Sequence, residues 1–165
     1  MASAFYPHIF KHMVKGDVDL DPVGSGGDTV RVMLLGPSYV YDANHEFVSA
    51  VVANELVDNG TTTIGYLRKD VSVVLNVDIN ANTGGAGTDD TDAGVFIEFD
   101  LDGDARWTDA TFTVRHAVMF VAGADDASSK LLYYFDLVNN QIVSSGTFAL
   151  LNPQPQPKIR RYSGA

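Results

Sequence analysis

The feature that most constrains the fold of this chain is an alternation of apolar and polar side chains with a period of two residues. The alternation is clearest at residues 71–77, where every odd position is apolar and Ser72 and Asn76 lie between them. Successive side chains of a strand point to opposite faces, so this period places one face in a core and the other in solvent. The same period recurs at residues 30–34, 95–99 and 112–120. Each of these segments is predicted to be a strand.

Two further strands are predicted near the C-terminal end, at residues 131–137 and 142–151. Asn139 and Asn140 separate them, and the tolerance of asparagine for positive φ suits a tight hairpin. Six or more strands joined by long loops, with only one or two short helices, predict an all-β fold. A β-sandwich is the expected architecture, and a jelly roll is one form that it can take.

Helical spacing is confined to two short segments. Phe5, Ile9 and Met13 recur at steps of four ahead of Gly16, which predicts a helical segment within residues 1–16. A second short helix is expected within residues 41–57, with Asp42 or Asn44 as its cap. The β-sandwich domain is assigned to residues 17–151. Two segments poor in apolar side chains, 17–28 and 80–94, are predicted to be exposed loops, the second of them mobile.

Residues 152–165 have the composition of an extended arm. Proline occupies positions 153, 155 and 157, and the basic residues Lys158, Arg160 and Arg161 follow. Alternating prolines favour polyproline geometry and cannot donate hydrogen bonds to a sheet. We therefore expect this arm to project from the domain, with its three basic side chains binding a partner.

The overall composition excludes several classes of function. The net charge is −10 and the sequence pI is about 4.5, so nucleic acid is not expected as a partner. There is no cysteine, which excludes disulfides and thiolate chemistry. No segment approaches the ~20 apolar residues of a membrane span, and the first sixteen residues do not have the pattern of a signal peptide. We expect a soluble protein that is synthesised in the cytoplasm.

The strongest candidate metal ligands are Asp100, Asp102 and Asp104, because alternating carboxylates around a glycine can bind Ca²⁺. An EF-hand loop places glycine at its sixth position and glutamate at its twelfth. Here the glycine is fourth and the twelfth residue is Thr111. The favoured interpretation is a turn after a strand, so no metal or other cofactor is predicted.

No pattern of catalytic residues stands out. His45 and Glu46 begin like a zinc-protease helix, but Ser49 stands where the second histidine ligand belongs. His116 lies on the apolar face of the 112–120 segment, where a hydrogen-bonded core or interface histidine is expected. The chain is therefore predicted not to be an enzyme.

Three segments resemble a widespread family of small virion structural proteins of tailed bacteriophages. The first block is DTVRVMLLGPSYVY at 28–41, with NHEFVSAVVANEL and Gly65-Tyr66 after it. The second is WTDATFTVRHAVMF at 107–120, and the third is LYYFDLVNNQIVSSGTFAL at 132–150. No catalytic residue is associated with this family.

The resemblance implies a capsid decoration, or cement, protein on the outer surface of the virion head. Its partner would be the major capsid protein. A homotrimer is expected because capsid lattices present threefold positions. A component of the neck, baseplate or tail is an alternative within the same class.

A different class of function is a β-sandwich for host adhesion that binds carbohydrate or calcium. It requires exposed aromatic side chains beside acidic loops, and the candidates are Trp107, Tyr39 and Tyr41 near Asp100. The competing expectation is that Trp107 is buried, since one large aromatic side chain commonly anchors a small core.

Overall fold

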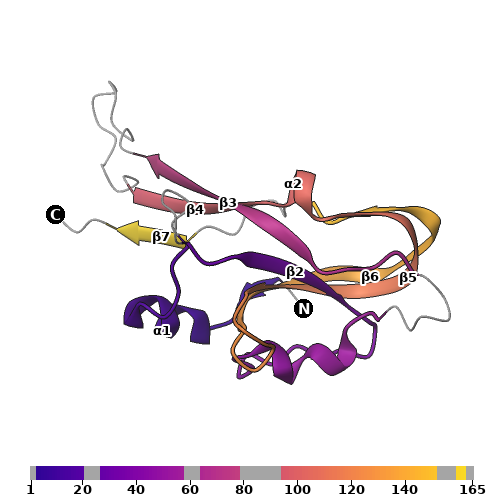
Figure 1. Ribbon diagram of the computed structural model, residues 1–165, viewed down its shortest axis with the longest axis horizontal. Helices are drawn as coiled ribbons and strands as arrows, with labels where there is room; N and C mark the ends of the chain where they lie inside the picture. The colour runs from indigo at the N-terminus through magenta and orange to yellow at the C-terminus, as the bar shows by residue number, and fades with distance from the viewer. Residues whose placement is uncertain (1–2, 21–26, 58–63, 79–93, 152–158, 163–165) are drawn as a thin grey trace.

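The computed structural model describes residues 3–20, 27–57, 64–78, 94–151 and 159–162 of the chain (Figure 1). Most of them belong to strands, as the all-β prediction requires. The elements, in chain order, are β1 (Ala4–Phe5), α1 (His8–Lys15), β2 (Val30–Leu35), the 3₁₀ turns η1 (Val48–Ala50) and η2 (Val52–Asn54), β3 (Lys69–Asp78), β4 (Gly94–Asp100), α2 (Leu101–Asp104), β5 (Arg106–Val121), β6 (Lys130–Ala149) and β7 (Ile159–Tyr162).

The strands pair antiparallel in the order β1-β6-β5-β2-β3-β4-β7. Strand β3 joins two parts of this order, because residues 69–71 pair with β2 and residues 72–78 pair with β4. The alternating segments of the sequence thus form β2, β3, β4 and β5, as predicted, but residues 116–121 of β5 are all buried, so the predicted solvent face is wrong there. The strands follow one another as neighbours in one sheet order, which does not by itself show two packed layers. The β-sandwich and the jelly roll therefore remain predictions.

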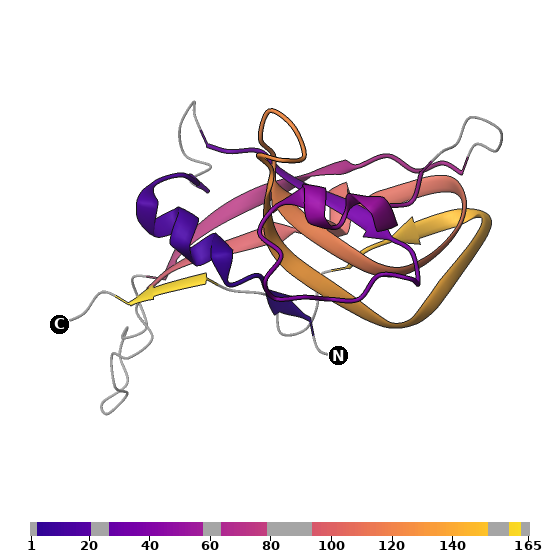
Figure 2. The ribbon, with the colours of Figure 1, turned by 90° about the horizontal axis from the view of Figure 1, so that it is seen from below.

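Strands β5 and β6 form a long, strongly curved hairpin (Figures 1 and 2). Their register shifts at several points, and Asp109, Val138 and Ser145 have positive φ. Such bulges bend a strand and increase its twist. The curvature brings the distant ends of the hairpin over the same core.

The predicted hairpin at Asn139 and Asn140 is wrong, because β6 continues through both residues. The pairs on either side are His116↔Asp136 and Val114↔Gln141. Residues 137–140 of β6 therefore lie opposite the single residue Arg115 of β5. The turn signal therefore marks a bulge, and the positive φ of 65° falls on Val138. The turn of the hairpin lies at residues 122–129 instead.

The core has a cluster on each face of β2. Val30, Val32 and Leu34 belong to the larger cluster, while Met33 and Leu35 belong to the smaller one. The prediction that this strand is half-buried is therefore wrong beyond Arg31, which is exposed as expected. The reason is that the segment carrying η1 and η2 covers the second face (Figure 2).

The helix predicted within residues 1–16 is confirmed as α1, which ends at Gly16 with a left-handed φ of 74°. The helix predicted within residues 41–57 is wrong, since that segment holds only the two 3₁₀ turns. Asp42 caps no helix and instead accepts a hydrogen bond from the backbone N–H of Asn44 at 2.8 Å.

Residues 21–26 of the loop predicted at residues 17–28 lie outside the described residues, and the described part is exposed only in part. Val18 and Leu20 are buried in the larger core cluster beside Ile9 of α1, so the expectation of a loop without packing is wrong there. Two apolar side chains are enough to hold this end of the loop against the sheet. The predicted mobile loop at residues 80–94 lies outside the described residues except for Gly94, which begins β4.

Candidate functional site

The basic residues predicted to bind a partner lie at an edge of the sheet. Residues 159–162 form β7 and pair with β4, with Arg160 opposite Phe96 and Arg161 opposite Val95. The prediction of an arm that projects from the domain is therefore wrong for these four residues, although they are extended. Without β7, this edge of β4 would present unpaired backbone groups, which an extended segment can satisfy. Lys158 lies outside the described residues.

The candidate calcium ligands lie at the junction of β4 and α2. Asp100 is the last residue of β4, and Asp102 and Asp104 belong to α2. The carboxylate of Asp104 accepts a hydrogen bond from the backbone N–H of Ser72 at 2.7 Å, which ties α2 to β3. The side chains of Asp100 and Asp102 lie outside the described part of the structure; among the side chains that are described, no group of histidine, aspartate and glutamate could hold a metal ion.

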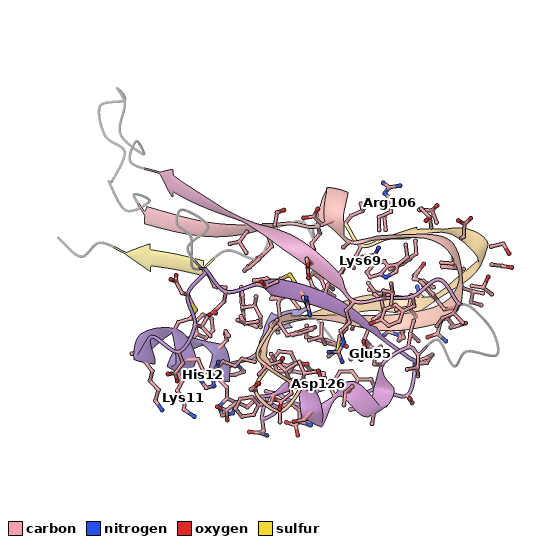
Figure 3. The ribbon with its side chains drawn as sticks, in the orientation of Figure 1. Lys11, His12, Glu55, Lys69, Arg106 and Asp126 are labelled. Carbon is pink, nitrogen blue, oxygen red and sulfur yellow. The ribbon has the colours of Figure 1, made fainter. Side chains whose placement is uncertain are left out.

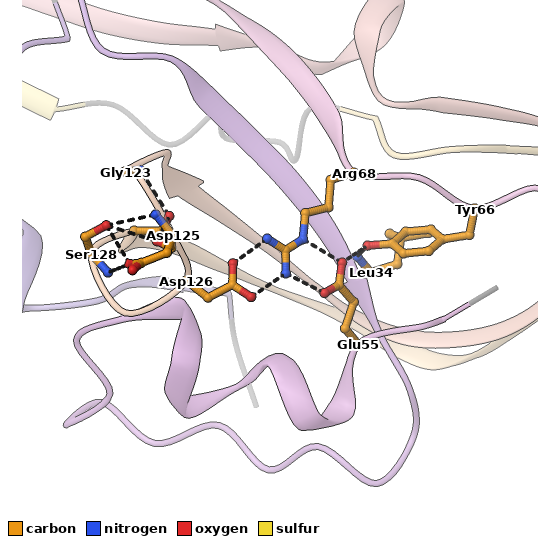
Figure 4. A network of polar contacts seen from close by, with 9 residues as sticks. Leu34, Glu55, Tyr66, Arg68, Gly123, Asp125, Asp126 and Ser128 are labelled. Atoms are coloured by element: carbon orange, nitrogen blue, oxygen red, sulfur yellow. Dashed lines mark hydrogen bonds and ion pairs between the residues drawn. The ribbon is translucent and has the colours of Figure 1, made fainter. Parts of the chain in front are cut away.

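An arginine clamp, formed by Arg68 with Glu55 and Asp126, is an extensive polar network among the described side chains (Figure 4). Arg68 donates to both oxygens of Glu55, at 2.8 and 2.6 Å, and to both oxygens of Asp126, at 2.6 and 3.0 Å. Tyr66 donates to Glu55 at 2.6 Å and accepts from the backbone N–H of Leu34 at 3.1 Å. The clamp joins the end of η2, the segment before β3 and the turn between β5 and β6.

The electrostatics of the arginine clamp favour its charged form. The hydrogen bond from Arg68 lowers the pKa of Asp126, and hydrogen bonds to both carboxylates raise the pKa of Arg68. Burial and the charge of Glu55 raise the pKa of Tyr66, which therefore stays protonated as a donor. The guanidinium also lies over the ring of Phe120, 5.4 Å from its centroid. The N–H donors of Arg68 are directed to the carboxylates of Glu55 and Asp126. The role of Arg68 is therefore to hold these segments of the fold together.

A second polar cluster fastens α1 to the chain ahead of η1. His12 contacts Glu46 through Nε2 at 2.7 Å and Asp17 through Nδ1 at 3.2 Å. Lys11, the neighbour of His12 on α1 in Figure 3, donates to Glu46 at 3.2 Å. Burial raises the pKa of Glu46, but hydrogen bonds from Lys11 and His12 outweigh this effect and lower it. Glu46 thus acts as an ionised anchor for α1.

His116 lies in an aromatic cluster on the smaller core. Its Nδ1 and the hydroxyl of Tyr134 are 2.7 Å apart, and its ring packs edge-on against Tyr39 at 5.7 Å. Burial, together with the charge of Arg115, lowers the pKa of His116. The expectation of a buried, hydrogen-bonded histidine on this strand is confirmed.

The aromatic side chains proposed for carbohydrate binding are not exposed. Trp107 is 1% exposed and Tyr39 is 4% exposed, while Tyr41 is half-buried. The indole N–H of Trp107 donates to the backbone carbonyl of Leu67 at 2.7 Å. The predicted burial of Trp107 is confirmed, and an exposed aromatic platform at these positions is not supported.

Sequence reasoning missed the arginine clamp because its members lie 13 and 58 residues from Arg68 along the chain. The available signals were the acidic pair Asp125-Asp126 and, in a distant part of the sequence, Arg68, but charge alone does not select partners. Comparisons with protein-family models, with curated proteins and with solved structures found no match. Among the described residues, no helix is long and apolar enough to cross a membrane.

Proposed function

We propose that this chain is a structural protein of a bacteriophage virion and that it decorates the outer surface of the head. The observation that carries the proposal is that the three sequence blocks of the phage resemblance fold into neighbouring strands. The first block contains β2, the second β5 and the third most of β6, and these strands are consecutive in the sheet order. Blocks that are far apart in the sequence thus build one unit, as shared family segments should.

Backbone contacts beyond the strands hold the first block together and join it to the start of β6. In the first block, the backbone N–H of Leu56 donates to the carbonyl of Leu34 at 3.0 Å. The NHEF segment reaches the start of β6, where Leu131 donates to the carbonyl of Glu46 at 2.9 Å. The arginine clamp adds side-chain bonds from Glu55 of the first block to Arg68, and from Arg68 to Asp126 in the turn between β5 and β6. A decoration protein needs such a closed domain because it must keep its fold on the outside of a particle.

The proposed partner is the major capsid protein, with this chain assembled as a homotrimer. A threefold assembly repeats one contact at each equivalent lattice position, so weak individual contacts add up to firm attachment. The edge that carries β4 and β7, with Arg160 and Arg161, is the proposed attachment region. These basic residues contrast with the acidic composition of the chain as a whole.

Cryo-electron microscopy of purified virions tests the location directly, and quantitative mass spectrometry gives the copy number. Decoration of the head predicts on the order of hundreds of copies per particle, at threefold positions of the lattice. About six or twelve copies, with density at one vertex, would place the protein in the neck, baseplate or tail. Absence of the protein from purified virions would refute the whole class.

A further inference from the structure

The bulge patch of β6, formed by residues 138–142, is the surface from which a further interaction follows. All five residues are exposed, and two of them are apolar, since Val138 is 71% exposed and Ile142 is 80% exposed. Val138 also has a left-handed φ of 65°, which is an outlier for a β-branched residue. Backbone strain of this kind clusters at functional sites. Packing of the core does not account for the patch, because neither apolar side chain is buried in it.

Polar contacts of neighbouring residues hold the bulge patch in place. The backbone N–H of Val138 donates to Oδ1 of Asp136 at 2.9 Å, and Arg115 of β5 donates to the same carboxylate. The side-chain amide of Gln141 donates to the backbone carbonyl of Asn139 at 3.2 Å. A surface that keeps one shape before binding loses less conformational entropy when it binds. The patch is therefore preorganised for a contact.

The outer edge of β6 is covered by described segments of the chain only as far as Asp136. The backbone N–H of Tyr6 donates to the carbonyl of Leu132 at 3.1 Å, and the backbone N–H of Asp136 donates to the hydroxyl of Ser3 at 3.1 Å. Strand β1 pairs with β6 between these two bonds. Within the described part of the chain, no strand pairs with this edge after Asp136. The bulge patch begins two residues later.

The charge distribution favours a second copy of the chain as the occupant of the patch. The net charge is −10, so two copies repel each other wherever their acidic surfaces meet. Residues 137–157 contain no charged side chain, and they are the longest uncharged run in the sequence. A twofold contact brings the same patch of both copies together, so a charge within it would lie near an identical charge. The bulge patch avoids this repulsion.

The order of side chains in the patch is the same in both directions. Its sequence is Val-Asn-Asn-Gln-Ile, with an apolar residue at each end and three amides between them. In an antiparallel contact with Asn140 on a twofold axis, Val138 of one copy lies opposite Ile142 of the other. Asn139 then lies opposite Gln141. Pairs of apolar side chains and pairs of amides both stabilise antiparallel contacts. A second copy accounts for this symmetry, whereas an unrelated partner does not.

We propose that two copies of this chain contact each other through the bulge patch, related by a twofold axis at Asn140. Stable interfaces use about 20–30 residues on each side, so a patch of five residues makes a weak contact that needs a high local concentration. The contact goes beyond the proposed homotrimer, because a twofold axis joins a copy to one outside its own trimer.

Disulfide trapping tests the axis, because the chain has no cysteine of its own. Asn140→Cys places both thiols on the axis, where opposite Cα atoms of antiparallel segments lie about 4.5–5.5 Å apart, within the range that a disulfide bridges. Ser144→Cys is the matched control, since Ser144 is exposed on the same strand but lies four residues from the axis. Its two copies would be about 27 Å apart. The full chain of each variant is oxidised with diamide at its highest soluble concentration.

We expect Asn140→Cys to form about tenfold more disulfide-linked dimer than Ser144→Cys under the same conditions. Adding Ile142→Asp to the Asn140→Cys variant should lower the yield of dimer several-fold, because it places a charge opposite Val138 of the other copy. Adding Val40→Asp instead should leave the yield unchanged, since Val40 is also exposed but lies outside the patch. Circular dichroism verifies that each variant folds, as expected for substitutions at exposed positions.

Two results would overturn the twofold contact. One is that Asn140→Cys forms no more dimer than Ser144→Cys, and the other is that Ile142→Asp leaves the yield of dimer unchanged. All these measurements use purified protein. They therefore do not depend on where the protein lies on a virion, and a failure of the proposed location would leave a 140–140 link intact.

Discussion

Replacement of Trp107 by alanine is the most direct test of the described core. The indole ring is 1% exposed, stacks on Tyr66 at 6.2 Å and packs against Phe148 at 5.8 Å. Emptying a site of this size costs about 3–5 kcal/mol of unfolding free energy. Loss of the 2.7 Å hydrogen bond to the Leu67 carbonyl adds to this cost, so we expect the upper end of that range.

Two further variants separate packing from hydrogen bonding. Trp107→Phe keeps a ring in the site and removes the N–H donor, so we expect a loss of about 1–2 kcal/mol. Ile142→Ala is the control, because Ile142 is 80% exposed and its truncation should change stability by less than about 0.5 kcal/mol. The assay is urea denaturation followed by far-ultraviolet circular dichroism.

Fluorescence provides an independent check, since Trp107 is the single tryptophan of the chain. The native protein should resist quenching by iodide and become quenchable in urea. The reasoning is refuted if native emission is readily quenched, or if Trp107→Ala costs less than about 1 kcal/mol.

Four other expectations follow from the described contacts. Arg68→Ala should lower the free energy of unfolding in urea by about 3 kcal/mol, because it leaves Glu55 without its charge partner. The control Arg31→Ala breaks an exposed pair and should lower it by less than about 1 kcal/mol. Equal losses would contradict the stabilising role of the arginine clamp. Folding lowers the pKa of Asp126, so its carboxylate contributes to the free energy of unfolding at pH values above the unfolded pKa of about 4. This contribution is lost as the pH falls through the folded pKa. Asp126→Asn should therefore flatten the acid limb of a plot of unfolding free energy against pH. Deletion of residues 153–165 should leave the melting temperature within a few degrees while weakening oligomers in sedimentation, since among the described side chains neither core cluster extends beyond Leu150; failure to fold would move the domain boundary. Millimolar calcium should leave the melting temperature unchanged in calorimetry, and a rise of several degrees that a chelator reverses would assign the Asp104 loop as a binding site.

Strands were predictable from the sequence where their signal is local. The period of two residues identified β2, β3, β4 and β5, because alternating apolar side chains mark an extended segment with at least one face in a core; the burial of the second face of β2 and of residues 116–121 of β5 was not predictable from it. The same reasoning found α1, where apolar side chains follow the helical period and Gly16 ends it with a positive φ. These elements could be predicted without knowing which other segments they pack against.

Local signals misled where the partner decided the outcome. Asn139 and Asn140 predict a hairpin, yet β5 pairs with β6 on both sides of them and turns the irregularity into a bulge. The prolines before residue 159 predict a projecting arm, yet the unpaired edge of β4 gives β7 a strand to pair with. Backbone hydrogen bonds to a distant strand outweigh local preference in both cases.

The sequence by itself determined that this chain is an acidic, cysteine-free all-β protein, while its assignment to phage virions stays a proposal. Only the tertiary structure decided which strands are neighbours, that both faces of β2 are buried, and that Arg68 joins Glu55 and Asp126. The physical reason is that periodicity records how one segment divides between core and solvent, whereas pairing and charge contacts depend on segments tens of residues away. Many such pairings satisfy the same local pattern, and the chain selects among them only when the core closes.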